Sequence, residues 1–125
     1  MQVYWLSYPS FLKEKISEPA VIAIGYFDGV HIGHQKVIQT AGEMAERLGV
    51  PLALMTFDPH PKEVLGQRTT IRYLTPIDEK IDLLKKLGVE KIYVMKFDHN
   101  LAQLSAEEFV EKVCVPLKVK GVVTG

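Results

Sequence analysis

Two histidines stand three residues apart in the segment 25–34, which follows an apolar run at 20–24. The run indicates a buried strand, and the residues after His34 have helical periodicity, so the segment is predicted to be a glycine turn into a helix. Free N–H groups and the positive dipole end of that helix favour an anion such as phosphate. His31 and His34 would share one face there and, with a usual pKa of about 6.5, gain protons readily when a polyphosphate approaches.

The histidine pair has two other interpretations. A structural zinc site is disfavoured because the chain has one cysteine, no third ligand nearby, and Gly33 between the histidines. Solvated histidines that cap a helix start are the second alternative. The strand, glycine turn and helix in sequence favour nucleotide phosphate, and Gly33 would let a bulky ligand approach the backbone.

Composition limits the class of partner. Lys plus Arg and Asp plus Glu both number 15, so no net field attracts a nucleic-acid backbone or an anionic membrane. The single cysteine, Cys114, lies in an apolar helical segment and is expected to be a buried structural thiol, in keeping with a reducing cytoplasm. No run of about 18 uncharged apolar residues and no basic leader is found. We expect a cytoplasmic protein that binds small molecules, and neither nucleic acid nor a membrane.

Short apolar strands alternate with amphipathic helices along the chain. Core strands are expected at 21–25, 52–57, 91–95 and 119–124, with a short edge strand at 3–6. Helices are expected at 34–48, 76–87 and 105–115, and a long functional loop at 58–73. This alternation predicts an α/β fold with a doubly wound parallel sheet, which binds its ligand beyond the carboxyl ends of the strands where the winding reverses.

Three local expectations follow from residue type and spacing. The helix at 76–87 should bury one apolar stripe, made of Ile77, Ile81, Leu84 and Leu87. The pair at 99–100 is interpreted as a surface turn. The aromatic pair at 4–5 is assigned to core or edge packing rather than to ligand stacking.

The turn segment resembles the signature of the nucleotidylyl transferase superfamily, in the form Gly25-x-Phe27-Asp28-Gly29-Val30-His31-x-Gly33-His34. In this long form it resembles the N-terminal adenylyltransferase module of bacterial bifunctional riboflavin kinase/FAD synthetases. Segments 56–61, 74–84 and 97–110 are similar to the same family in the same order, and the resemblance runs from about residue 20 to Gly125. It implies a Rossmann-like sheet with core strands in the order 3-2-1-4, which would place Gly25 and Gly125 on adjacent strand ends at the switch point.

The resemblance implies an FMN adenylyltransferase (FAD synthetase), which transfers AMP from ATP to FMN with Mg²⁺ and gives FAD and pyrophosphate. Two prolines fix the backbone around His60, and although a plain rigid turn would look the same, the resemblance makes this loop part of the flavin pocket. Asp28 is equally explained as a turn former. The predicted catalytic residues are His31 and His34. The predicted binding residues are Gly25, Phe27, Asp28, Gly29, Gly33, Asp58, Pro59, His60, Pro61, Thr124 and Gly125. No metal ligand is assigned.

Two alternatives remain open from the sequence. One is another small-molecule nucleotidyltransferase, such as a pantetheine-phosphate adenylyltransferase, and the other is an inactive nucleotide-binding fragment or regulator. The family pattern continues past the fourth core strand with a fifth strand, a Ser-Ser-Thr-x-x-Arg segment and a riboflavin kinase domain. We therefore expect residues 1–125 to be a single partial adenylyltransferase domain, truncated after that strand, with the riboflavin kinase domain absent and no measurable FAD synthesis alone.

Overall fold

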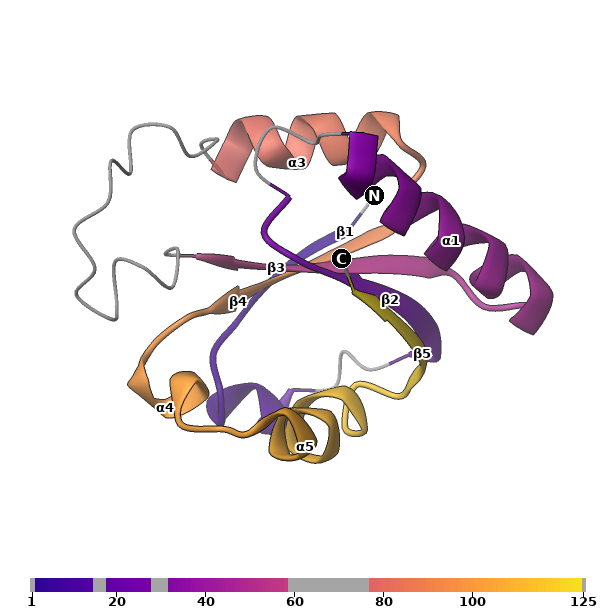
Figure 1. Ribbon diagram of the computed structural model, residues 1–125. Coiled ribbons are helices and arrows are strands. Elements are labelled where there is room, and N and C mark those ends of the chain that lie inside the picture. Colours follow the sequence, from indigo (N-terminus) through magenta and orange to yellow (C-terminus); the bar gives the residue numbers. More distant parts are fainter. Residues whose placement is uncertain (1, 15–17, 28–31, 59–76, 125) are drawn as a thin grey trace.

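One parallel sheet organises the chain in a computed structural model that describes residues 2–14, 18–27, 32–58 and 77–124. The strands in these ranges are β1 (Gln2–Leu6), β2 (Ala20–Ile24), β3 (Leu52–Asp58), β4 (Lys91–Lys96) and β5 (Val119–Thr124). They lie in the order β1-β4-β3-β2-β5, and every pairing is parallel (Figure 1). The expected core order 3-2-1-4 corresponds to β4-β3-β2-β5 and is confirmed, and the short edge strand is β1 beside β4.

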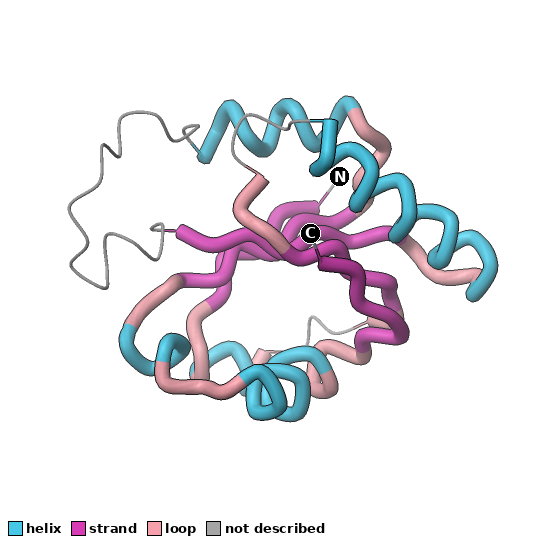
Figure 2. The backbone as a smooth tube through the Cα atoms, viewed as in Figure 1, coloured by secondary structure: helices cyan, strands magenta, loops and turns pink. Residues whose placement is uncertain are grey.

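Helices cover both faces of the sheet, as Figure 2 shows. One layer holds α1 (Ile32–Leu48) and α3 (Ile77–Lys86). The other holds the 3₁₀ turn η1 (Ser10–Lys13), α4 (His99–Ala102), α5 (Ala106–Phe109) and the π-helical turn η4 (Val110–Cys114). Glycines end both helices of the first layer in the left-handed region, with φ 68° at Gly49 and 84° at Gly88.

The hydrophobic core has two halves separated by the sheet. In β2, Ile22 packs toward the layer with α4 and α5, whereas Val21 and Ala23 pack under α1 and α3. All three side chains are fully buried. Burial of successive residues on both faces is the pattern of a doubly wound parallel sheet, so the predicted fold class is confirmed.

Residues 99–100 are exposed, as expected, but they begin a helix rather than forming a turn. The Asp98 carboxylate accepts a hydrogen bond from the Leu101 N–H at 3.0 Å and caps the four-residue helix α4. Leu101 is buried against the core beneath α4. One capped turn is too short to show a helical period in the sequence, which explains the wrong prediction.

The helix expected at 105–115 begins as predicted and then changes its winding. A capping box is present, in which the Ser105 hydroxyl accepts from the Glu108 N–H and the Glu108 carboxylate accepts from the Ser105 N–H, both at 3.1 Å. From Val110 the backbone widens into a π turn that ends at Cys114. Cys114 is buried, as expected, and burial raises the pKa of its thiol to about 11.

The buried stripe of α3 differs from the expected one. Leu84 is fully buried, but Leu87 is 37% exposed, and Lys80 occupies a buried position at 4% exposure. At the sheet edge, the Tyr4 ring stacks on Tyr93 with centroids 5.6 Å apart, whereas Trp5 is 56% exposed. Within the four described ranges, no helix has the length and apolar character needed to cross a membrane.

Candidate functional site

The junction between β2 and α1 lies at the switch point of the sheet. The chain leaves β2 at Ile24, passes through α1 and returns in β3 on one side of β2, whereas β5 lies on the other side. Thr124 at the end of β5 is in register with Ile24. The start of α1 therefore stands above adjacent strand ends, where an α/β sheet binds its ligand.

Close packing fixes the first residues of this junction. The Gly25 N–H donates to the Met55 carbonyl at 3.1 Å, which extends the pairing of β2 with β3. A Cβ at Gly25 would lie 3.1 Å from the Phe27 ring, so the absence of a side chain permits that approach. Phe27 itself is buried and has φ 56°, a conformation that bulky residues rarely adopt.

The Phe27 ring supports the second histidine of the signature. Its centroid lies 5.3 Å from that of the His34 imidazole, in an edge-on arrangement. His34 is half-buried in the first turns of α1. Because the Phe27 ring is buried, it packs against the imidazole rather than facing solvent, and binding through the Phe27 backbone N–H stays a prediction.

A buried polar chain ties this junction to the neighbouring elements. The Thr56 hydroxyl on β3 donates to the Tyr26 carbonyl at 3.1 Å, and Lys80 Nζ on α3 donates to the Thr56 hydroxyl at 3.4 Å. Neither Thr56 nor Lys80 was predicted from the sequence to belong to the site. Two signals were available: a hydroxyl residue inside an apolar strand, and a lysine three residues after Ile77 and four before Leu84, on the buried face of α3.

An aromatic group lies next to the predicted acceptor loop. Three rings surround Phe57, with centroids 5.5 Å away for Tyr26, 6.0 Å for Phe97 and 6.5 Å for Phe109. None of the four is fully buried. Asp58 follows Phe57 and is exposed at the end of β3. Partly exposed rings beside a polar strand end suit a planar aromatic ligand, and the sequence analysis did not assign Tyr26, Phe97 or Phe109 to a site.

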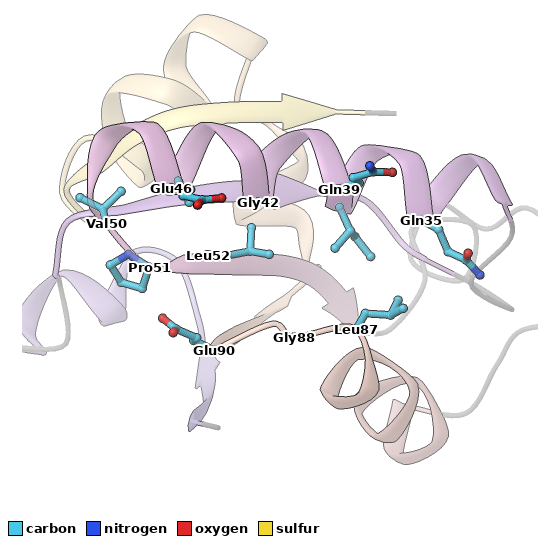
Figure 3. Close-up of a pocket in the computed structure, with 12 residues that line it drawn as sticks. Gln35, Gln39, Gly42, Glu46, Val50, Pro51, Leu52, Leu87, Gly88 and Glu90 are labelled. Carbon is cyan, nitrogen blue, oxygen red and sulfur yellow. The ribbon is translucent and has the colours of Figure 1, made fainter.

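Two cavities help to place the site. A pocket of about 330 Å³ opens at the carboxyl ends of β1, β3 and β4, between Trp5, Asp58 and Lys96. A larger groove of about 580 Å³ runs along α1 and past the turn after α3 (Figure 3). The carboxylates of Glu46 and Glu90 line that groove and disfavour a polyphosphate. The candidate site is therefore the end of the sheet where the strands have their carboxyl ends, called the carboxyl edge below, and not the larger groove.

The structure brings together several of the predicted site residues. Gly25, Phe27, His34 and Thr124 gather at the switch point, Gly33 lies in the first turn of α1, and Asp58 ends the adjacent strand. The predictions for Asp28, Gly29, His31, Pro59, His60, Pro61 and Gly125 fall outside the described residues. In the part of the chain that is described, no three His, Cys, Asp or Glu side chains cluster as metal ligands.

Comparison with known proteins decides the family. The family model described as FAD synthetase matches residues 13–125. The chain belongs to the FAD synthetase family. Among curated FAD synthetase relatives, the bifunctional riboflavin kinase/FMN adenylyltransferase of Bacillus subtilis is 43% identical and that of Listeria monocytogenes 41%, each across 100% of this chain. The Escherichia coli K12 protein of the same description is 33% identical over 91% of the chain.

The chain is shorter than these relatives, and its fold matches that of a solved structure. It spans about 40% of the length of the Bacillus and Listeria relatives and 37% of the Escherichia coli one. A crystal structure described as a macrolide-efflux protein from Streptococcus pneumoniae superposes with a TM-score of 0.83 at 28% identity. That match covers 100% of this chain and 41% of the other.

Proposed function

We propose that this chain carries the adenylyltransferase module of an FAD synthetase, which transfers AMP from ATP to FMN and releases FAD and pyrophosphate. The observation that carries the proposal is the His34 imidazole, packed against Phe27 at the start of α1 and above the strand ends of β2 and β5. Membership of the FAD synthetase family supports the same activity. A helix start at a switch point favours the phosphates of a nucleotide.

The proposed reaction is an in-line displacement at phosphorus. A phosphate oxygen of FMN attacks the α-phosphorus of ATP, the bond from that phosphorus to the bridging oxygen breaks, and pyrophosphate leaves. The protein contributes position and electrostatic stabilisation, as in phosphoryl transfer generally. His31 and His34 would hold the ATP phosphates and neutralise the charge that moves to pyrophosphate, assisted by the N–H groups at the start of α1.

Mg²⁺ enters this proposal as part of the MgATP substrate. The ion keeps several waters and is commonly held by substrate phosphates with one or two carboxylates, so it needs no dedicated cage of protein ligands. Among the described residues, no three His, Cys, Asp or Glu side chains cluster as metal ligands. The protein's own residues hold the nucleotide.

The aromatic group around Phe57 is the proposed acceptor pocket. Its partly exposed rings could contact the flat isoalloxazine ring of FMN. In this proposal the acceptor would lie at the end of β3 and ATP at the end of β2. Neighbouring parallel strands thus bring the two substrates together.

The named relatives are bifunctional, and the chain spans only part of their length. We propose that residues 1–125 belong to the adenylyltransferase module and that a riboflavin kinase domain occupies further sequence in the full-length protein. A cytoplasmic location fits small-molecule substrates and a single buried thiol.

A comparison of acceptors tests the proposed function. The full-length protein is incubated with MgATP and one of FMN, phosphopantetheine or nicotinate mononucleotide, and pyrophosphate and the adenylylated product are measured. We expect FMN to yield one pyrophosphate per FAD, and the other acceptors to yield none above the blank. Pyrophosphate release with phosphopantetheine or nicotinate mononucleotide, but not with FMN, would contradict the proposal.

A further inference from the structure

Lys80 is a residue of α3 and is buried, at 4% exposure, whereas the other polar residues of this helix are exposed. Lysine is rarely buried to this extent unless its head group is bound. Its Nζ reaches the hydroxyl of Thr56, which is itself fully buried on β3. The Thr56 hydroxyl in turn bonds the Tyr26 carbonyl, just after β2. Three elements of the fold thus meet in one buried polar chain.

The chemistry of the three groups determines which one donates and which one accepts in each of the two hydrogen bonds. A lysine head group with its full complement of protons donates hydrogen bonds and accepts none, and a backbone carbonyl only accepts. The single hydroxyl proton of Thr56 is therefore directed to Tyr26, while a lone pair of the same oxygen accepts from Lys80. A hydrogen-bond chain of this kind is reinforced in a low-dielectric interior, because each bond polarises the next.

The Tyr26 carbonyl, which accepts the last of these hydrogen bonds, belongs to a strained turn. The Tyr26 carbonyl shares its peptide unit with the N–H of Phe27, whose φ is 56°. A bulky residue holds this left-handed conformation only where its surroundings impose it. The hydrogen bond from Thr56 holds the plane of that peptide, so it helps to impose the Phe27 conformation.

The strained residue in turn supports the candidate catalytic imidazole. The Phe27 ring is 2% exposed and meets His34 edge-on, with centroids 5.3 Å apart. Gly25 leaves no room behind the ring, because a Cβ there would lie 3.1 Å from it. A change in the Tyr26–Phe27 peptide would therefore move the ring and, through it, the imidazole.

We propose that Lys80 is a positioning residue for His34, acting through the Thr56 hydroxyl and the Tyr26–Phe27 peptide. Its contribution is to orient the imidazole at the switch point; the proposal gives it no contact with substrate. The consequence for catalysis rests on the proposed function. The effect on the His34 ring does not, and it can be measured in the free protein.

The first test observes the His34 ring directly, by NMR of the full-length protein labelled with ¹³C-histidine. Lys80→Met and the near-isosteric Thr56→Val should both shift the His34 ring resonances, because the Phe27 ring next to it moves. Lys80→Arg should restore them toward the wild-type positions. Lys86→Met changes an exposed lysine on the same helix and should leave them in place. An unchanged His34 resonance in folded Lys80→Met and Thr56→Val protein would overturn the proposal.

The second test is a double-mutant cycle that combines Lys80→Met with His34→Ala. We expect Lys80→Met to lower kcat for FAD formation about tenfold, with KM for FMN within about twofold, because the transition-state contact of His34 is lost. In the His34→Ala background, Lys80→Met should cause no further loss. An equal loss in both backgrounds would show that Lys80 does not act through His34. If the wild-type protein forms no FAD, the proposed function fails, and the NMR result alone decides the role of Lys80.

Discussion

In the described part of the chain, two lysines are buried, and they bind different partners near opposite ends of the strands. Lys91 begins β4 and pairs with the carboxylate of Glu18, whose side chain is 68% exposed. Lys80 reaches Thr56 near the end of β3, within the polar chain that ends at Tyr26. The first contact ties the segment before β2 to the end of the sheet where the strands begin, called the amino edge below. The second holds a turn at the carboxyl edge, where the candidate catalytic residue lies.

Burial of a lysine therefore does not by itself indicate its role. A contact at the amino edge lies away from the ligand sites of doubly wound sheets, which are found beyond the carboxyl ends, so we expect it to act on stability. A contact at the carboxyl edge can also set the orientation of a functional group. Turnover and stability measured on the same variants separate the two kinds of contact.

The largest expected effect is at His34. His34→Ala in the full-length protein should lower adenylyl transfer at least tenfold, equivalent to about 1.4 kcal/mol of barrier, since a donor to the ATP phosphates is lost. The midpoint of thermal unfolding should change little. The control is His99→Ala, at an exposed position on α4 in the other layer. Steady-state FAD formation checks this, and wild-type turnover in His34→Ala would contradict the assignment.

A smaller effect is expected from a single methyl group behind the Phe27 ring. Gly25→Ala should lower turnover by about fivefold, because displacement of the ring misplaces the imidazole. It should also lower the free energy of unfolding by about 1–3 kcal/mol through overpacking. The measurement combines initial rates with denaturant unfolding.

Gly42→Ala is the matched control. A Cβ at Gly42 would meet Leu52 at 3.7 Å, an ordinary contact, so turnover should not change. Because Gly42 lies inside α1, the alanine should raise stability by up to about 1 kcal/mol. Equal turnover in the two alanine variants would show that the ring packing does not matter.

These residues also show what sequence could and could not predict. The order of the core strands was implied by the resemblance alone. The place of Gly25 and His34 was predictable because the alternation of strands and helices agrees with the resemblance. The burial of Lys80 and Lys91 was not, because charged residues in an amphipathic pattern are normally assigned to the solvent face. The π turn after Phe109 leaves no mark in a period of 3.6 residues.

The acceptor loop offers a third and more selective test. His60→Ala should weaken FMN binding by about fivefold and leave ATP binding nearly unchanged, because the two substrates are proposed to meet different strand ends. His60 itself lies outside the described residues, two positions beyond Asp58. Calorimetric titration of each ligand checks this. An equal loss for both ligands would mean that the loop is only structural.

The smallest expected effect is at the amino edge. The hydrogen bond from Lys91, followed by its charge, lowers the pKa of the Glu18 carboxyl from its usual value of 4.5. A carboxyl whose pKa is lower in the folded state stabilises the fold above its unfolded pKa, and this contribution is lost as pH falls through the folded pKa. Salt and solvent screen the effect, because Glu18 is exposed.

Glu18→Gln should therefore lower the midpoint of thermal unfolding slightly at pH 7, and the difference from wild type should shrink as pH falls below about 4.5. Turnover at pH 7 should not change. Glu14→Gln, an exposed carboxyl nearby in the chain, serves as the control. If the difference in unfolding midpoint between Glu18→Gln and wild type did not change with pH, the proposed role of the Glu18 charge would be wrong. If turnover fell, the contact at the amino edge would affect catalysis as well as stability.

The central claim is that the carboxyl edge of this sheet transfers an adenylyl group to FMN. The most direct measurement follows ATP labelled separately at its α- and γ-phosphates, with FMN as the acceptor, the full-length protein and no riboflavin present. We expect the α label to appear in FAD and the γ label in pyrophosphate, and His34→Ala to slow both together. An α label that never enters a flavin product, while ATP is consumed, would contradict it.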